Sequence, residues 1–452
     1  MSATPVIAIF DVGKTNKKLF LFDENYNIVF ERSASFIETV DEDGFPCENL
    51  ESLKQSVNDS LAMIFNLAEF NVKAVNISAY GASFVNVGAD GEAITPLYNY
   101  LKPYPEAISN NFYAKYGGAE SFSADTASPV LGNLNSGLQL YLLKMEKPEL
   151  FAQLKYALHL PQYLSFLLTG QYYSDLTSIG CHTALWNFSE NKYHQWVEKE
   201  GIALKLAPIA PGKSTFPAIF RENKYLAGIG LHDSSAALIP YLLNFQEPFV
   251  LISTGTWCIS LNPFDHSPLT FEQLKADCLC YITFQGKPVK ASRLFSGYIH
   301  EKQCERIAEH FNQSNLKYKQ INYDAELIRH LEINFEQGLN FEQRDLHNFK
   351  DDVEAYHQLI LDLVALQFKA TQMVLAETNV KRIFVDGGFS KNSIFMHLLA
   401  ATFPETEVFA ASMAQASAVG AALAIHQAWN HLQIPSDIIE LKYYSSNKAI
   451  SK

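Results

Sequence analysis

The sequence predicts an α/β protein built from two related domains that meet at a cleft. Short apolar runs alternate with turns and with helical patterns along most of the chain. The order strand, glycine-threonine turn, strand, strand, helix, strand occurs twice, starting near Val6 and near Phe249. The chain has 452 residues, which is enough for two or three domains of about 100–200 residues each. We therefore expect one domain at residues 1–245 and a second at residues 246–452.

The first half opens with three predicted strands, a helix and a fourth strand. Val6–Phe10 is a short apolar run typical of a buried strand, and turns separate it from Lys17–Phe22 and Ile28–Arg32. Apolar residues recur at helical spacing across Leu50–Ala68, and Val72–Ser78 is the next predicted strand.

The middle of the chain is mostly helical, and the β pattern returns near residue 249. The remaining predicted helices are Gly137–Met145, Pro148–Lys155, Leu158–Thr169, Glu301–Phe311, Val353–Glu377, Ser390–Ala401 and Ala414–Ala428. The remaining predicted strands are Leu226–Gly230, Phe249–Ser253, Trp257–Asn262, Cys280–Phe284, Lys381–Val385 and Glu407–Phe409. If the two halves are related domains, a ligand is expected in the cleft between them, where small-molecule sites are common.

Charge and cysteine usage exclude several classes of protein. Asp and Glu outnumber Lys and Arg by 48 to 35, so the formal net charge is −13. An acidic surface repels nucleic acid and anionic membranes, so neither is expected as a partner. The six cysteines form no CxxC pair, as expected of reduced thiols in a cytoplasmic protein. The N-terminal residues lack the basic start of a signal peptide, and no run approaches about 18 apolar residues. These features predict a cytoplasmic location.

The segment Asp11–Asn16, DVGKTN, lies between two predicted strands and can bind phosphate. Gly13 can adopt a positive φ, and the backbone N–H groups of Gly13, Lys14, Thr15 and Asn16 can then converge on one anion. Asp11 at the strand end can hold Mg²⁺, which prefers few carboxylates together with phosphate oxygens and water. The alternative is an ordinary hairpin turn with solvated lysines.

Two further glycine turns extend this pattern. Gly255 and Thr256 hold the equivalent position in the second half, so facing hairpins can grip one nucleotide from both domains. Gly387 and Gly388 follow a strand and open a helix near Asn392, where free N–H groups and missing side chains allow close approach of a ligand. The alternative for both segments is a plain structural turn.

His232 and Asp233 precede the small residues SSAA at a predicted helix start. Asp233 is either an N-cap residue or a general base that takes a proton from an alcohol attacking phosphorus. His232 is either a hydrogen-bond donor to a substrate or a loop histidine. Elsewhere in the first half, Tyr98, Tyr100 and Tyr104 with Lys102 either line a polar pocket or form a surface loop.

Taken together and in order, these motifs resemble those of the FGGY carbohydrate kinases, which share the actin–hexokinase fold. DVGKTN resembles the first phosphate motif, STGTW the second, and DGGFSKN with the Ala-rich segment after it the C-terminal signature. HDSSAA resembles the segment that carries the catalytic aspartate. The His-Asp pair, the GTW and the Thr-Asn are most similar to the rhamnulokinase and L-fuculokinase branch. The resemblance implies two actin/hexokinase-like, ribonuclease H-like domains.

This sequence departs from that branch at three places. Lys14 stands where a small residue is usual. Gly81, Ala82 and Ser83 occupy the expected substrate segment, where the branch commonly has an aspartate at the position of Ser83. An arginine often found near residues 98–102 is missing. The substrate is therefore expected to differ from rhamnulose and fuculose or to be bound differently.

The resemblance implies transfer of the ATP γ-phosphoryl group to a hydroxyl of a sugar such as a deoxyketose. Asp233 is the expected general base, and Asp11 and Asp233 are the expected carboxylates near Mg²⁺. The turns at Gly13 and Gly255 would hold phosphates, and Gly387, Gly388 and Asn392 would border adenosine. Gly81–Ser83 with His232 and Asp233 would border the sugar. The expected partner is a small-molecule sugar, with a monomer or homodimer as the assembly.

The alternatives are a kinase for another polyol, pentulose or sugar acid, a degenerate kinase, and a nucleotide-binding member of the superfamily that phosphorylates no sugar.

Overall fold

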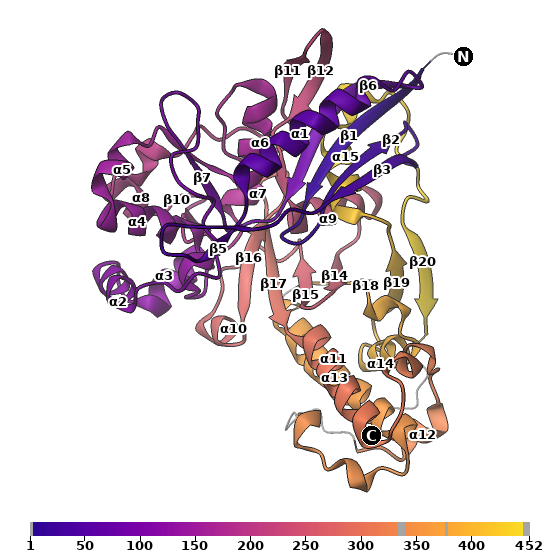
Figure 1. Ribbon diagram of the computed structural model, residues 1–452. Coiled ribbons are helices and arrows are strands. Elements are labelled where there is room, and N and C mark those ends of the chain that lie inside the picture. The colour runs from indigo at the N-terminus through magenta and orange to yellow at the C-terminus, as the bar shows by residue number, and fades with distance from the viewer. Residues whose placement is uncertain (1–2, 333–339, 376–377, 446–452) are drawn as a thin grey trace.

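Two seven-stranded sheets organise the computed structural model, which describes residues 3–332, 340–375 and 378–445 (Figure 1). The N-terminal sheet runs β11-β12-β6-β1-β2-β3, with β13 beside β6. Its strands are β1 (Thr4–Val12), β2 (Lys17–Phe22), β3 (Ile28–Ala34), β6 (Phe70–Ala79), β11 (Thr215–Phe220), β12 (Asn223–Gly228) and β13 (Leu231–His232).

The C-terminal sheet runs β16-β17-β15-β14-β18-β19-β20. Its strands are β14 (Phe249–Thr254), β15 (Cys258–Asn262), β16 (Cys278–Ile282), β17 (Pro288–Leu294), β18 (Arg382–Gly387), β19 (Glu407–Ser412) and β20 (Glu440–Tyr444). Three small antiparallel pairs complete the described strands: β4 (Thr39–Val40) with β5 (Pro46–Cys47), β7 (Phe84–Val87) with β8 (Tyr156–His159), and β9 (Trp186–Asn187) with β10 (Lys192–Tyr193).

The two sheets repeat one topology, as the sequence predicted. β1 pairs antiparallel with β2 and parallel with β6. β14 likewise pairs antiparallel with β15 and parallel with β18. The α/β fold class with two related halves is therefore confirmed.

The third strand predicted for the second half is present, but the sequence missed one further strand of this sheet. The predicted strand Cys280–Phe284 corresponds to β16 at the sheet edge, and the strand beside β15 is β17, which the sequence pattern missed. β17 lacks an apolar run because Lys290 is one of its inward residues, only 2% exposed. Lys290 is tolerated there because its ammonium group forms a 2.9 Å ion pair with the equally buried Asp265.

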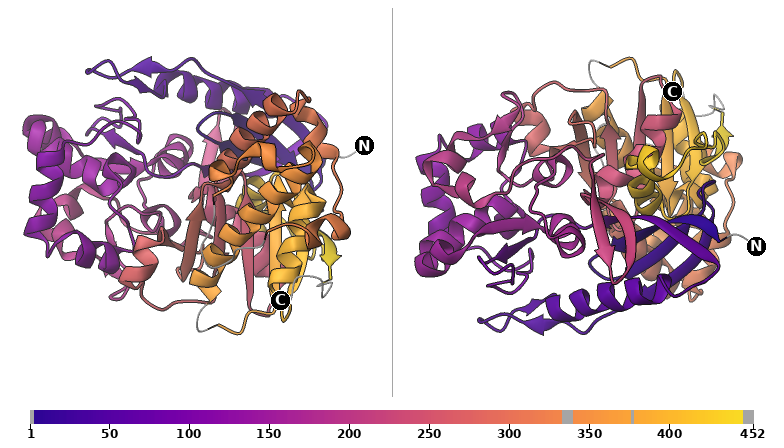
Figure 2. Two further views of the ribbon diagram at one scale, coloured as in Figure 1. Left: turned by 90° about the horizontal axis from the view of Figure 1, so that it is seen from below. Right: turned by 90° about the horizontal axis from the view of Figure 1, so that it is seen from above.

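The helices of the first half lie in two places. α1 covers the N-terminal sheet, whereas α2–α5 and α8 gather at one side, away from both sheets (Figures 1 and 2). The latter group has its own core, centred on Trp196, Phe112 and Phe122. The helices are α1 (Leu50–Ile64), α2 (Glu106–Lys115), α3 (Ala119–Thr126), α4 (Ser136–Glu146), α5 (Pro148–Gln153), α6 (Leu160–Thr169), α7 (Leu176–Ile179), α8 (Gln195–Lys199) and α9 (Asp233–Asn244).

The helices of the second half are α10 (Phe271–Lys275), α11 (Ser296–His310), α12 (Ala325–Arg329), α13 (Asp352–Leu375), α14 (Ser393–Thr402), α15 (Ala416–Ala424) and α16 (His426–Trp429). The helix predicted at Ala414–Ala428 is thus divided in two, and the predicted end of α13 at Glu377 lies outside the described residues. Among the described helices, α13 alone is long and apolar enough to span a membrane, but most of it is buried in the core of the C-terminal half.

The helices α9 and α15 pack against each other between the two sheets. Their side chains share one apolar core with Ile7 and Ile9 of β1 and Phe249 of β14. At the crossing, a Cβ built on Gly420 would lie 1.8 Å from the carbonyl oxygen of Ala236. The backbones therefore touch directly, and this contact joins the two halves.

Replacing Gly420 with alanine should force α9 and α15 apart. Overpacking of this kind costs about 1–3 kcal/mol, so the thermal unfolding midpoint should fall by about 2 °C or more. Gly388→Ala is the matched control, because a Cβ at Gly388 meets no heavy atom within 4 Å. Equal midpoints for the two variants, measured by scanning calorimetry, would contradict the close contact.

Candidate active site

The carboxyl ends of three strands in the N-terminal sheet meet at one edge. In the register of β1 with β6, Asp11 lies opposite Ser78. Leu231 of β13 pairs with the same Ser78 from the other side. The chain then enters α9 at Asp233, so Asp11 and Asp233 come to the same end of the sheet. In open α/β sheets this end is where ligands bind.

Asp233 faces a cavity of 250 Å³ that lies between the two halves. Its lining combines α9 with β14, β15 and α15: Asp233, Ser234, Ala237, Leu251, Ser253, Ile259, Leu261, Ala416 and Ser417. The carboxylate of Asp233 accepts hydrogen bonds from the backbone N–H and the hydroxyl of Ser234, at 2.6 and 3.2 Å. Asp233 is the first residue of the helix and not its N-cap, which is His232.

The carboxyl groups of Asp11 and Asp233 repel each other. Burial, and then the charge of Asp233, raise the pKa of Asp11 to about 6, while Ser417 donates to both of its carboxylate oxygens at 3.1 Å. Burial likewise raises the pKa of Asp233 to about 6, and the hydrogen bonds from Ser234 only partly offset this effect.

A divalent cation would relieve this repulsion. Two carboxylates with room for phosphate oxygens and water suit Mg²⁺, so Asp11 and Asp233 fit the expected ion. Within the described ranges there is no cluster of three or more His, Cys, Asp or Glu side chains able to hold a metal by themselves.

His232 is a buried, neutral neighbour of Asp233. Its Nε2 lies 3.3 Å from Oδ1 of Asp233 and 3.1 Å from Sγ of Cys181, and Nδ1 lies 3.4 Å from the hydroxyl of Ser235. Burial lowers the pKa of His232 to about 3, so the ring is uncharged near pH 7. The ring stacks on Tyr281 of β16, which fixes its plane. His232 is thus placed to orient Asp233.

The segment Gly81, Ala82 and Ser83 lies directly behind this histidine. A Cβ on Gly81 would come within 2.8 Å of Cys181 Sγ and 2.9 Å of His232 Cδ2. Ala82 has a φ of 61°, and its carbonyl oxygen accepts a 2.8 Å hydrogen bond from Gln139. Ser83 is only 1% exposed. The predicted substrate segment therefore contacts the predicted base through His232.

The turn between β1 and β2 closes through a 2.8 Å hydrogen bond from the Gly13 N–H to the Asn16 carbonyl. Gly13 does not have the positive φ that the sequence suggested. The requirement for glycine is instead spatial, because a Cβ would lie 3.1 Å from that same carbonyl oxygen. Thr15 and Asn16 are exposed at the tip of the turn.

The lysines of this turn are all paired with glutamates. Lys14 forms a 2.8 Å ion pair with Glu38, and Lys18 forms one of 3.2 Å with Glu31. Lys17 is buried and pairs with the buried Glu48 at 2.9 Å. In this arrangement the Lys14 ammonium group binds Glu38, so the turn offers an anion mainly its backbone N–H groups.

The other two glycine turns form one unit held together by Thr254. The Thr254 hydroxyl donates to the Asp386 carbonyl at 2.5 Å and accepts from the Phe389 N–H at 3.0 Å. Gly387 has a φ of 91°, and a Cβ there would lie 1.9 Å from the Thr254 carbonyl oxygen. Only glycine fits at this position.

The residues at the tips of this unit differ in whether they are exposed to solvent or hydrogen-bonded within the protein. Gly255 and Thr256 are exposed, as are Gly387 and Gly388. Asn392 instead caps α14, accepting a 3.0 Å hydrogen bond from the Phe395 N–H and donating to the Tyr356 hydroxyl at 2.8 Å. Its side chain is therefore occupied within the protein.

Sequence reasoning missed two residues that face this site. Ser417 holds Asp11 from the opposite half, and only the packing of α15 reveals it. Arg293 lies directly across from Ile259 in the β15–β17 register, so both side chains point to the cavity face of the sheet. Its Nη2 donates to Asp277 at 2.6 Å, its Cζ lies 5.4 Å from the centre of the Trp257 ring, and its buried Nε has no hydrogen-bond partner among the described residues. Because β17 was not predicted, no sequence signal pointed to Arg293.

The carboxyl pair should titrate well above the usual range for aspartate. With pKa values near 6, the two groups gain protons as the pH falls through about 6 and are ionised above it, as one coupled system. Isotope-edited infrared titration of the carboxyl bands should show this step. In Asp233→Asn the Asp11 step should shift to lower pH, because this change removes the charge that raises the pKa of Asp11. An unchanged Asp11 titration in Asp233→Asn would rule out the coupling.

Two family models match the chain. The N-terminal domain of the FGGY family of carbohydrate kinases matches residues 6–235, and the FGGY carbohydrate kinase C-terminal domain matches residues 246–433. Among curated relatives, the rhamnulokinase of Bacteroides thetaiotaomicron is 25% identical over 224 residues, covering 46% of this chain and 44% of that protein. The L-fuculokinase of Escherichia coli is 22% identical over 271 residues, covering 56% and 55%. The chain thus spans about half the length of the curated relatives it matches.

Solved structures resemble the fold along almost the whole chain. A carbohydrate kinase from Novosphingobium aromaticivorans superposes with a TM-score of 0.79 at 24% identity, covering 99% of this chain and 95% of the other. A ligand-bound xylulose kinase from Lactobacillus acidophilus gives 0.81 at 18% identity, covering 98% and 95%. With both family models matched along the two halves, the chain belongs to the FGGY family of carbohydrate kinases.

Proposed function

We propose that this protein transfers the γ-phosphoryl group of ATP to a hydroxyl of a small sugar, a ketose such as a deoxyketose. One observation carries the proposal. Asp233 lines the cavity between the halves together with Ser253, which begins the second glycine turn, and it lies within electrostatic reach of Asp11 at the first turn. A base, a cation site and two phosphate turns are the parts that phosphoryl transfer to an alcohol needs.

Each part has a role in this proposal. The turns Gly13–Asn16 and Gly255–Thr256 bind the phosphates from the two sides through the N–H groups that remain free. The Gly13 N–H donates to the Asn16 carbonyl and the Gly255 N–H to the Trp257 carbonyl, so these two glycines shape the turns. Gly387, Gly388 and Asn392 border the adenosine, with Asn392 acting through the helix it caps. Gly81–Ser83 and His232 form the wall of the sugar site. Asp11 and Asp233 would hold Mg²⁺, which would supply positive charge to the phosphates when bound.

Asp233 supplies the base. Its ionised carboxylate accepts the proton of the sugar hydroxyl as the hydroxyl oxygen bonds to the γ-phosphorus. The bond from that phosphorus to the bridging oxygen breaks, and ADP leaves with the electron pair. His232 remains neutral and keeps the carboxylate oriented. Such catalysis rests on positioning and charge stabilisation.

We extend the proposal to the organisation of the chain. The division into domains falls between residues 245 and 246, in the connection from α9 to β14. The protein acts in the cytoplasm on a small molecule, as a monomer or homodimer.

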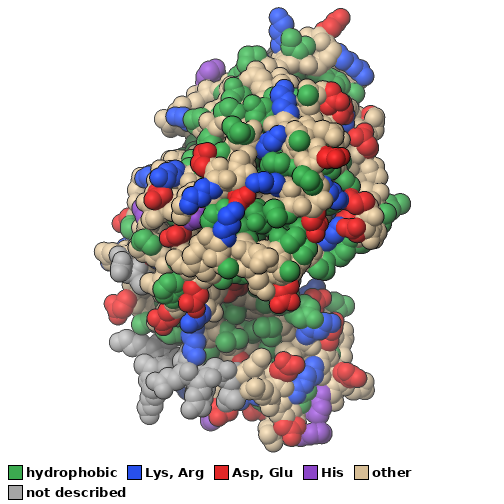
Figure 3. All heavy atoms as spheres, turned by 90° about the vertical axis from the view of Figure 1, so that its left-hand side faces the viewer, with side chains coloured by type: hydrophobic (Ala, Val, Ile, Leu, Met, Phe, Trp, Pro, Cys, Tyr) green, Lys and Arg blue, Asp and Glu red, His purple; other side chains and the backbone are tan. Residues whose placement is uncertain are grey.

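On the face in Figure 3, basic and acidic side chains are interspersed, which gives a polyanion no continuous positive surface there.

Asp233→Ala should lower kcat by about a hundredfold or more, the lower range for loss of a general base. Nucleotide binding should change little, and the wild-type rate should fall as the pH drops below about 6, where the carboxyl gains its proton. Asp125→Ala, at a half-exposed carboxylate beside His194, is the control. Coupled ADP-release assays with a panel of ketoses measure kcat and its pH dependence for the wild type and both variants. Near-normal turnover in Asp233→Ala would reject the assignment.

Two other outcomes of the same screen are informative. A nucleotide-binding protein that phosphorylates no sugar would bind ATP but release ADP at a sugar-independent rate. A degenerate kinase would show neither turnover nor a pH step with any sugar. The close grouping of Asp233, His232 and Gly81–Ser83 favours the kinase, because nucleotide binding alone needs none of them.

Arg293 favours a second candidate, a sugar acid as substrate. The arginine expected near residues 98–102 is absent, whereas the guanidinium group of Arg293 faces the cavity side of the C-terminal sheet with an unpartnered Nε. Burial, and then the charge of Arg293, lower the pKa of His182 to about 3. Burial raises the pKa of Tyr281, and the same arginine opposes that rise. Arg293 is ion-paired with Asp277 through Nη2, so what it offers beside the wall of the proposed sugar site is the free Nε–H of a guanidinium group, to which a substrate carboxylate can accept a hydrogen bond.

If the substrate is an aldonic acid, Arg293→Gln should raise its KM about tenfold or more, a loss of about 1.4 kcal/mol, with a smaller effect on neutral ketoses. Arg329→Gln, at an exposed arginine of α12, is the control. The measurement is steady-state kinetics on matched acid and ketose pairs. Equal effects on both substrates would eliminate the sugar-acid candidate.

A further inference from the structure

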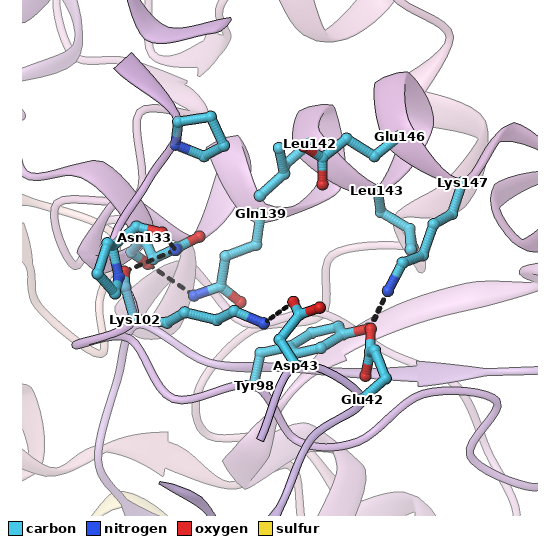
Figure 4. Close-up of a pocket in the computed structure, with 12 residues that line it drawn as sticks. Glu42, Asp43, Tyr98, Lys102, Asn133, Gln139, Leu142, Leu143, Glu146 and Lys147 are labelled. Carbon is cyan, nitrogen blue, oxygen red and sulfur yellow. Dashed lines mark hydrogen bonds and ion pairs between the residues drawn. The ribbon is translucent and has the colours of Figure 1, made fainter. Parts of the chain in front are cut away.

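A second cavity lies in the N-terminal half, apart from the one at Asp233. It has a volume of 330 Å³ and is enclosed by the turn between β4 and β5, the segment around Tyr98 and one face of α4 (Figure 4). It shares no lining residue with the Asp233 cavity. Its volume lies within the range of small-molecule sites. Of the residues that the sequence suggested for a polar pocket, Tyr98 and Lys102 line this cavity, whereas Tyr100 and Tyr104 do not.

Gln139 is the polar group at the centre of this cavity. It is only 8% exposed, and its amide reaches into the cavity (Figure 4). Its Nε2 donates to the carbonyl oxygens of Ala82 and Asn133, at 2.8 and 2.6 Å. Its Oε1 accepts no hydrogen bond from any described residue. This oxygen is open to the cavity, so the O–H or N–H of a ligand can donate to it.

The charges of the cavity exclude an anion. Lys102 forms ion pairs of 2.6 Å with both Asp41 and Asp43, and Lys147 is paired with Glu42. The ammonium groups are thus already neutralised. Glu146, which has no partner among the described residues, adds a further negative charge to the lining. The groups left free are acceptors, so the ligand must bring donors and no negative charge.

The rest of the lining is apolar. The ring of Tyr98 and the side chains of Leu142, Leu143, Pro103 and Pro105 complete the wall. A ligand that presents hydroxyl donors at its edge and C–H groups on its face matches both kinds of surface. An uncharged monosaccharide ring has this character, and aromatic side chains with few placed polar groups are the usual lining for such ligands.

We propose that this cavity is a second, non-catalytic binding site for a neutral monosaccharide. The site is coupled to the active site through Gln139, because the same amide that faces the ligand holds the carbonyl of Ala82. Ala82 has a positive φ, a conformation that a non-glycine residue keeps only when its surroundings hold it. A bound sugar fixes Gln139 and thereby Ala82. This coupling rests on the proposed function, whereas the binding itself does not.

The binding is tested with methyl glycosides of neutral hexoses and 6-deoxyhexoses, whose locked rings cannot open to a ketose. Saturation-transfer NMR at about 10 mM detects sites of millimolar affinity. We expect binding by wild type and by Asp233→Ala, and at least a tenfold loss in Leu142→Trp, which fills the cavity, and in Gln139→Leu, which removes the acceptor. Leu204→Trp, at a leucine that is 81% exposed, is the matched control.

Absence of binding by all probes to the wild type would overturn the proposal, as would full binding by Leu142→Trp and Gln139→Leu, each confirmed folded by calorimetry. The coupling is tested separately: the bound glycoside should change the KM for the sugar substrate at least twofold in wild type and not in Leu142→Trp. If the wild type phosphorylates no sugar, the proposed function fails while the binding result stands.

Discussion

The backbone contact between α9 and α15 is the constraint on which the proposed chemistry depends. Gly420 leaves no space for a methyl group against the carbonyl of Ala236. Asp233 lies three residues before Ala236 on one helix, and Ser417 lies three residues before Gly420 on the other. One helical turn therefore separates the contact from each of these side chains. Ser417 in turn holds Asp11, so a single crossing point sets the relative positions of both carboxylates.

The same geometry bears on how an acidic protein would bind the triphosphate that we propose as its substrate. The formal charge is −13, and Lys14, Lys17 and Lys18 near the first turn are each paired with a glutamate. What remains for phosphate is a set of backbone N–H groups on tight turns, which carry partial positive charge at no cost in side-chain ordering. A cation bound near Asp11 and Asp233 would also reduce the repulsion between the two carboxylates, so metal and nucleotide are expected to bind together.

Much of this arrangement could be predicted from the sequence because the strands, turns and helices have strong local patterns. The first hairpin, the repeat of topology and the helix start at Asp233 all followed from apolar periodicity and glycine spacing. β17 could not be found, since its buried Lys290 is stabilised by Asp265, which belongs to the loop after β15 and is adjacent only in space. Arg293 was missed with it. The sequence predicted that Gly13 is needed for a positive φ, and this prediction was wrong. Glycine is needed there because a side chain would crowd the carbonyl oxygen of Asn16, three residues later. The contact of Ser417 with Asp11 spans 406 residues and has no local signal.

The most direct test is a crystal structure of the protein with Mg²⁺ and a non-hydrolysable ATP analogue. Our account predicts the phosphate chain between the turns at Gly13 and Gly255, Mg²⁺ within reach of Asp11, and the γ-phosphate facing the carboxylate of Asp233 across the cavity. Phosphates bound outside these two turns, or a γ-phosphate on the far side of α15 from Asp233, would contradict it.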